Sequence, residues 1–89
     1  MSKTCTRAPL LRLAITADLC PQPTPRILGL IAQRSIIPVS IIQVQRPRSL
    51  ALEIILAPPD RQQGEILCAK IAELVGVRQV RRLRPPPAP

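Results

Sequence analysis

The stretch Pro23–Gln45, PTPRILGLIAQRSIIPVSIIQVQ, contains the change of hydrophobic period that decides the fold. Its first half has apolar residues at the three- and four-residue spacing of a helix. We expect Thr24 to cap this helix and Pro25 to take its first position, where a missing N–H costs nothing. From Ile36 to Val44 isoleucine and valine dominate, as in strands. The stretch therefore predicts a helix that ends near Ser35 and leads directly into a strand.

The predicted strand 36–44 is apolar on both of its faces. Val39 and Ile41 lie on one face, and Ile42 and Val44 lie on the other. One face can pack on the helix, whereas the other needs cover from outside the domain. We therefore expect an edge strand that pairs with a second copy, with these four side chains in a homodimer interface.

Two further strands are indicated by strict alternation of apolar and polar residues. The first, Leu10–Ala17, has one buried face formed by Leu11, Leu13, Ile15 and Ala17. The second, Leu50–Leu56, shows the clearest alternation in the chain, with Leu50, Leu52, Ile54 and Leu56 on the buried face. Since these two strands have the strongest one-sided patterns, we expect them at the centre of the sheet.

The C-terminal third predicts a second helix and a last strand. The helix runs from Gln62 to Val75, with Asp60 as its cap and Gly76 as the left-handed residue that ends it. Its apolar face is expected to hold Leu67, Ile71, Leu74 and Val75. Residues 77–83, VRQVRRL, form a weak strand that we place at the other edge of the sheet.

The predicted order is β-α-β-β-α-β, an α+β arrangement of the ferredoxin-like type. A four-stranded antiparallel sheet would carry two helices on one face. We divide the chain into a flexible arm (1–9), a folded domain (10–83) and a proline-rich tail (84–89).

The charge balance is strongly basic, at +8 over 89 residues. Arg78, Arg81, Arg82 and Arg84 form a basic run that suits phosphate groups or an acidic protein surface. However, the chain has no aromatic residue on which a base could stack. We therefore expect that the partner is not a nucleic acid. The alternative that we keep is a basic nucleic-acid-binding protein.

The residue types of the chain give little support for catalysis or metal binding. The chain has no histidine, the commonest acid–base residue. Its acids are scattered over the predicted elements as Asp18, Glu53, Asp60, Glu65 and Glu73. We expect no enzyme activity, no metal and no cofactor. The odd number of cysteines and the lack of a long apolar run predict a cytoplasmic protein without structural disulfides or a membrane span.

Three segments carry a resemblance to a known family: GLIAQRSIIPVSIIQV (29–44), LALEIILA (50–57) and AKIAELVGVRQVRRL (69–83). Together they resemble the ACT domain, and more narrowly the short small subunits of acetolactate synthase. The resemblance implies a non-catalytic regulatory subunit in branched-chain amino-acid biosynthesis. Such a subunit binds and activates the thiamine-diphosphate-dependent catalytic subunit, to which all cofactors belong. The alternative that it implies is a free-standing ACT-like amino-acid sensor for another enzyme.

The same resemblance implies a ligand-binding loop before the first helix, at Pro21, Gln22, Thr24 and Arg26. ACT domains commonly have Pro-Gly where this chain has Pro21-Gln22, so no glycine lets a ligand approach the backbone closely. Ser35 also stands where a glycine often follows the first helix. We therefore expect a regulatory subunit that responds poorly to valine.

Overall fold

The computed structural model describes residues 10–84. Its elements are β1 (Leu11–Asp18), α1 (Pro23–Gln33), β2 (Ser40–Gln45), β3 (Ser49–Leu56), α2 (Arg61–Ala72) and β4 (Val77–Leu83). This is the predicted β-α-β-β-α-β order. The arm expected at 1–9 and residues 85–89 of the expected tail lie outside the described residues.

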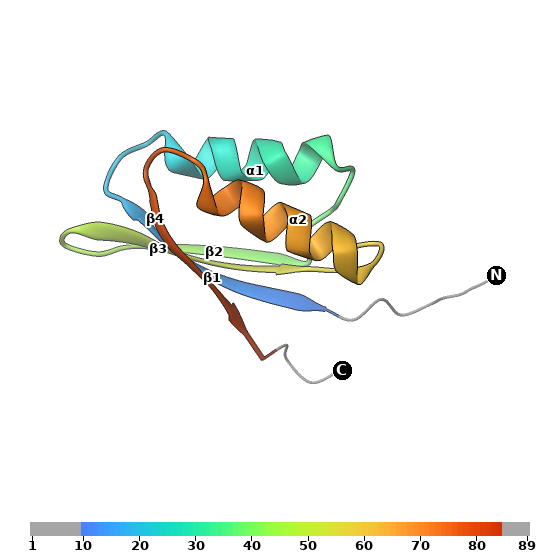
Figure 1. The fold of residues 1–89 in the computed structure, drawn as a ribbon. Coiled ribbons are helices and arrows are strands. Elements are labelled where there is room, and N and C mark those ends of the chain that lie inside the picture. Colours follow the sequence, from blue (N-terminus) through green and yellow to red (C-terminus); the bar gives the residue numbers. More distant parts are fainter. Residues whose placement is uncertain (1–9, 85–89) are drawn as a thin grey trace.

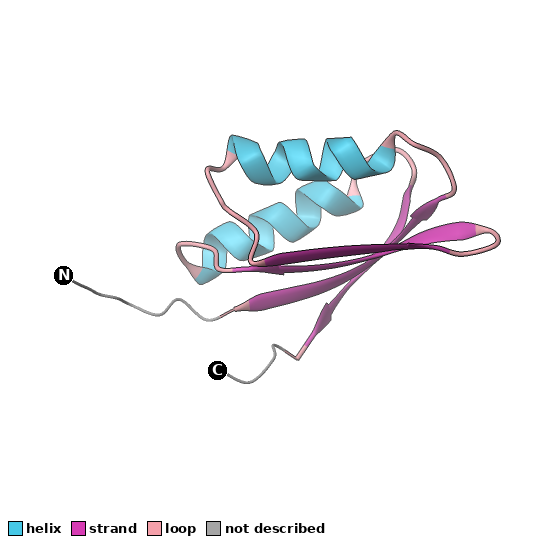
Figure 2. Ribbon diagram, turned by 180° about the vertical axis from the view of Figure 1, so that it is seen from behind, coloured by secondary structure: helices cyan, strands magenta, loops and turns pink. Residues whose placement is uncertain are grey.

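The strands form one antiparallel sheet in the order β2-β3-β1-β4. Both helices lie on the same face of this sheet (Figures 1 and 2). The ferredoxin-like prediction is therefore confirmed, with β1 and β3 at the centre and β2 and β4 at the edges. Across the sheet, Leu13 is opposite Ile54 of β3 and Arg82 of β4, which fixes the faces of all four strands.

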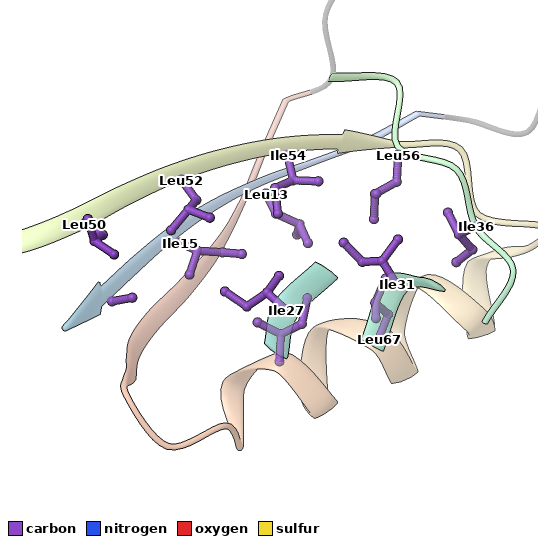
Figure 3. Packing of buried hydrophobic residues seen from close by; sticks show 12 residues of the cluster. Leu13, Ile15, Ile27, Ile31, Ile36, Leu50, Leu52, Ile54, Leu56 and Leu67 are labelled. Atoms are coloured by element: carbon purple, nitrogen blue, oxygen red, sulfur yellow. The ribbon is translucent and has the colours of Figure 1, made fainter. Parts of the chain in front are cut away.

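The core lies between the sheet and the two helices (Figure 3). It is built from the side chains that the alternation singled out on β1 and β3, together with Ile36 and four helix residues, Ile27, Ile31, Leu67 and Ile71. The predicted buried faces are confirmed at Leu13, Ile15, Ala17, Leu50, Leu52, Ile54 and Leu56. With no aromatic residue available, branched aliphatic side chains provide nearly all of this buried volume.

The end of α1 differs from the prediction that the next strand starts at Ile36. Ser35 adopts the left-handed conformation (φ 58°), and its N–H donates to the carbonyl of Ala32. The N–H of Ile36 donates to the carbonyl of Ile31 at 3.2 Å, which completes a Schellman motif. This turn folds Ile36 back onto the core, where it is buried. β2 therefore begins only at Ser40.

The predicted cap of α2 is confirmed, and its predicted end is wrong. Asp60 accepts a hydrogen bond from the Gln63 N–H at 2.8 Å. The helix ends at Ala72, before the predicted Val75, and Val75 is 80% exposed in the turn that follows. Gly76 does have a positive φ, of 95°, although it lies in this turn, immediately before β4.

Candidate functional site

The loop between β1 and α1 opens onto a hollow of about 540 Å³ beside β2. The loop contributes Leu19, Cys20 and Pro21, the start of α1 contributes Thr24 and Pro25, and the strands contribute Gln43, Gln45 and Leu50. The hollow therefore brings together Pro21 and Thr24, two of the four loop residues that the sequence singled out. Gln22 and Arg26 are exposed and do not line it.

Thr24 does not act as the helix cap. The helix starts at Pro23, one residue before Thr24, and the residue that precedes it, Gln22, makes no capping hydrogen bond through its side chain. The Thr24 hydroxyl instead donates to Oε1 of Gln43 on β2 at 2.6 Å. The prediction that Thr24 caps the helix is wrong because a proline at either 23 or 25 fits the first turn of a helix. The packing of the loop determines that the helix starts at Pro23.

The back of the loop is fixed by contacts with the start of β4. The Asp18 N–H donates to the Gly76 carbonyl at 2.7 Å, and the Asp18 carboxylate accepts from Nε of Arg78 at 2.6 Å. Gly76 also packs directly on the buried ring of Pro23, where an added Cβ would lie 2.9 Å from Cγ. The first turn of α1, which carries Thr24 and Pro25 to the hollow, is therefore held against the start of β4.

The hollow is lined mainly by apolar side chains and by three uncharged polar ones. Thr24, Gln43 and Gln45 supply a hydroxyl and two carboxamides, and no lining residue carries a charge. Pro21, Pro23 and Pro25 have no N–H to offer to a carboxylate. An amino-acid ligand needs partners for both a carboxylate and an ammonium group, and this lining offers few of them.

Within residues 10–84, no three His, Cys, Asp or Glu side chains gather as a metal site would require. Among the described helices, none is long and apolar enough to cross a membrane.

The edge strand β2 is the second candidate site. Every residue from Ile41 to Gln45 is exposed. The four residues expected in a homodimer interface are Val39 (61% exposed), Ile41 (41%), Ile42 (52%) and Val44 (46%). Because Ile41 is opposite the buried Ile54, it lies on the helix side, whereas Ile42 and Val44 lie on the other face. Val39 precedes the strand, yet its N–H pairs with the Ile55 carbonyl at 2.7 Å.

Sequence reasoning missed Gln43 and Gln45 as site residues. Both share the face of Ile41, so the alternation of the strand was the available signal. The alternation alone does not show that these amides lie beside the loop. Their position follows from the register with β3, in which Gln43 is opposite Leu52 and Gln45 is opposite Leu50.

Comparison with protein-family models gives no match, and comparison with curated proteins gives none either. Solved structures do match. The crystal structure of the ACT domain from the GTP pyrophosphokinase of Chlorobium tepidum aligns with a TM-score of 0.74 at 19% identity, over 83% of this chain and 96% of that one. A homoserine dehydrogenase from Thiobacillus denitrificans aligns with a TM-score of 0.73 at 20% identity, over 90% of this chain and 18% of that one.

A third match is the C-terminal domain of the MgtC protein from Mycobacterium tuberculosis. Its TM-score is 0.70 at 16% identity, over 91% of this chain and 92% of that domain. At these identities the matches establish the fold. The chain has the βαββαβ fold of the ACT domain from the GTP pyrophosphokinase.

Proposed function

We propose that this protein is a non-catalytic regulatory small subunit of acetolactate synthase that acts in the cytoplasm. In this role it binds the catalytic subunit and raises its activity, and it belongs to branched-chain amino-acid biosynthesis. The observation that carries the proposal is the ACT-type fold, which supports a regulatory module. The acetolactate synthase assignment rests on the resemblance of segments 29–44, 50–57 and 69–83 to the small subunits of that enzyme.

We further propose that the subunit works as a homodimer joined along β2. Two copies paired antiparallel through this strand would form one continuous eight-stranded sheet. The strand suits the purpose because its sequence, SIIQVQ, carries no charge and is exposed on both faces. The opposite edge strand, VRQVRRL, would set arginines of two copies against each other, so pairing through β4 is disfavoured.

The test is to mix the protein with the catalytic subunit of acetolactate synthase from the same organism and to follow size-exclusion elution by light scattering. We expect a complex that contains both chains. Separate elution of the two proteins at micromolar concentrations would contradict the proposal.

A second candidate, an ACT-like amino-acid sensor for another enzyme, is supported by the volume of the hollow beside the β1–α1 loop and not by its lining, which offers few partners for a carboxylate or an ammonium group. A sensor would bind a free amino acid there, and the T24V variant would weaken binding because it removes the hydroxyl bonded to Gln43. Thr16 is the matched control, because it lies on β1 and does not line this hollow. Calorimetry against the amino acids, with T24V and T16V side by side, separates this function from the first.

A further inference from the structure

One face of the sheet has no helix over it. Both helices pack on the opposite face, and within residues 10–84 no other element covers this one (Figures 1 and 2). The strand register sets a row of cross-strand neighbours on it, from Ile42 through Glu53 and Ala14 to Arg81. The row starts with an apolar side chain on β2 and ends with a cation on β4. We call the surface formed by this row and its neighbours the open face.

A second row lies beside the first and gives the open face its shape. It runs from Val44 through Ala51 and Thr16 to Gln79. Because Ala14, Thr16 and Ala51 are small, the centre of the face is lower than its sides. The result is a hollow of about 310 Å³ that has Ile42 and Val44 on one side and Arg81 on the other.

The charges on the open face are not balanced. Glu53 is the acid that lines the hollow, and its Oε2 accepts from Nε of Arg12 at 2.6 Å. Asp18, which is opposite Ser49 on the same face, is paired with Arg78. Arg46 and Arg81 also line the hollow. In the described part of the chain, neither of them lies within ion-pair distance of a carboxylate. The surface therefore offers two unpaired guanidinium groups, that of Arg46 beside the half-exposed apolar side chains of β2 and that of Arg81 across the sheet on β4.

We propose that the open face is a docking surface for a protein segment that carries apolar side chains at one end and carboxylates at the other. The apolar end would pack on Ile42 and Val44 of β2, and the carboxylates would pair with Arg81 on the opposite edge strand, β4. This proposal does not depend on the identity of the client enzyme. Pairing of two copies through the backbone edge of β2 would leave Ile42 and Val44 on the open face of the continuous sheet.

The dimensions of the face define the segment. β2 and β4 are three strand steps apart in the order β2-β3-β1-β4, which corresponds to roughly 14 Å between their axes. An extended chain covers this distance in about four residues. A short segment that crosses the strands can therefore contact the apolar and basic sides of the face at once.

Other occupants fit the same surface less well. A second copy placed face to face would bring Arg12, Arg46 and Arg81 of both chains together against one glutamate each, and the like charges would repel. A nucleic acid would find cations but no aromatic side chain to stack on, since the chain has none. Carboxylates combined with apolar groups match both halves of the face.

The test uses the full chain, labelled with nitrogen-15, and a short synthetic peptide that has two valines at one end and two glutamates at the other, separated by four residues. Two control peptides replace the glutamates by lysines or the valines by glycines. We expect amide shift changes centred on Ala14, Thr16, Ala51 and Arg81, and much smaller changes with either control peptide.

Arg81 and its neighbour Arg82 provide a matched pair of variants. Both are exposed on β4, yet the register sets Arg81 opposite Ala14 on the open face and Arg82 opposite the buried Leu13 on the helix side. R81E and R82E change the net charge equally. We expect R81E to weaken peptide binding about fivefold and R82E less than twofold, because only the first loses a contact with the glutamates.

Several results would overturn the proposal. One is equal weakening by R81E and R82E, since that would mean attraction to net charge alone. Another is binding on the helix side, or no shift with millimolar peptide. Stronger shifts of the same amides with poly(uridylic acid) would make the face a nucleic-acid surface. If the shifts of these amides changed with protein concentration in the absence of peptide, the open face would be a contact between two copies.

Discussion

Replacing Gly76 by alanine tests the junction that holds the first turn of α1 against β4. The φ angle of Gly76 is +95°. A left-handed conformation costs an L-residue about 1–2 kcal/mol. The added Cβ would also lie 2.9 Å from Cγ of Pro23, a buried ring that cannot rotate away. Overpacking of this kind costs about 1–3 kcal/mol.

Alanine offsets part of this cost, because it lowers the entropy of the unfolded chain by about 0.4–1 kcal/mol. The net expectation is a loss of about 2–4 kcal/mol in the free energy of unfolding. This is a large share of the roughly 5–15 kcal/mol typical of a domain. The first turn of α1, which carries Thr24 and Pro25 to the loop hollow, should become mobile with it, since Pro23 and the Asp18 N–H both contact Gly76.

Gly29 provides the matched control for this substitution. It lies inside α1, and an added Cβ there would meet no heavy atom within 4 Å. G29A should therefore stabilise the protein by about 0.5–1 kcal/mol, the advantage of alanine over glycine in a helix. Both variants can be followed by urea unfolding with far-UV circular dichroism, since the chain has no tryptophan or tyrosine for fluorescence. Protein concentration must be equal in all samples, because the proposed dimerisation would contribute to the apparent stability. A G76A variant within about 0.5 kcal/mol of the wild type would refute the reasoning.

Three further predictions concern the helix end, the edge strand and the loop. S35G should raise the free energy of unfolding by about 0.5–1 kcal/mol, because glycine adopts the φ of 58° without strain; a decrease in urea unfolding would argue against the Schellman geometry. I42K should shift the homodimer toward monomer by placing charge at the β2 edge, whereas V75K, at a position 80% exposed in the α2–β4 turn, should not. Light scattering at micromolar concentration checks this pair, and a monomeric wild type would rule the dimer out. Valine titrated by calorimetry should bind weakly, because the loop offers few donors; micromolar affinity, with inhibition that depends on this subunit, would show that the loop does sense valine.

The central strands were predictable because their burial is one-sided. β1 and β3 alternate between buried leucine or isoleucine and half-buried residues, and this period survives any detail of tertiary packing. The order of elements followed from these strands and the two helical patterns. The Asp60 cap was equally local, because the side chain bonds to an N–H only three residues along the chain.

The boundaries of α1 and β2 were not predictable in the same way. Isoleucine at position 36 favours a strand by residue type, yet the Schellman motif at Ser35 folds its side chain onto the core at the end of α1. Proline fits a first helical turn at either 23 or 25, and the contact with Gly76, 53 positions away from Pro23, favours the earlier one. Contacts of such sequence separation leave no local signal.

The candidate site was predictable only for those residues that are close together in the sequence. Pro21 and Thr24 are only three positions apart in the sequence and share the hollow. Gln43 enters only through the pairing of β2 with β3, which sets the strand beside the loop. The open face likewise needed the register, since no run of the sequence places Ile42, Ala14 and Arg81 in one row.

The most direct measurement is the rate of acetolactate formation by the catalytic subunit as this protein is added to it in valine-free buffer. The proposed regulatory role predicts that the rate rises and then saturates once the catalytic subunit is fully bound. A rate that stays constant over the whole titration, with both proteins folded, would contradict the role as a subunit of acetolactate synthase.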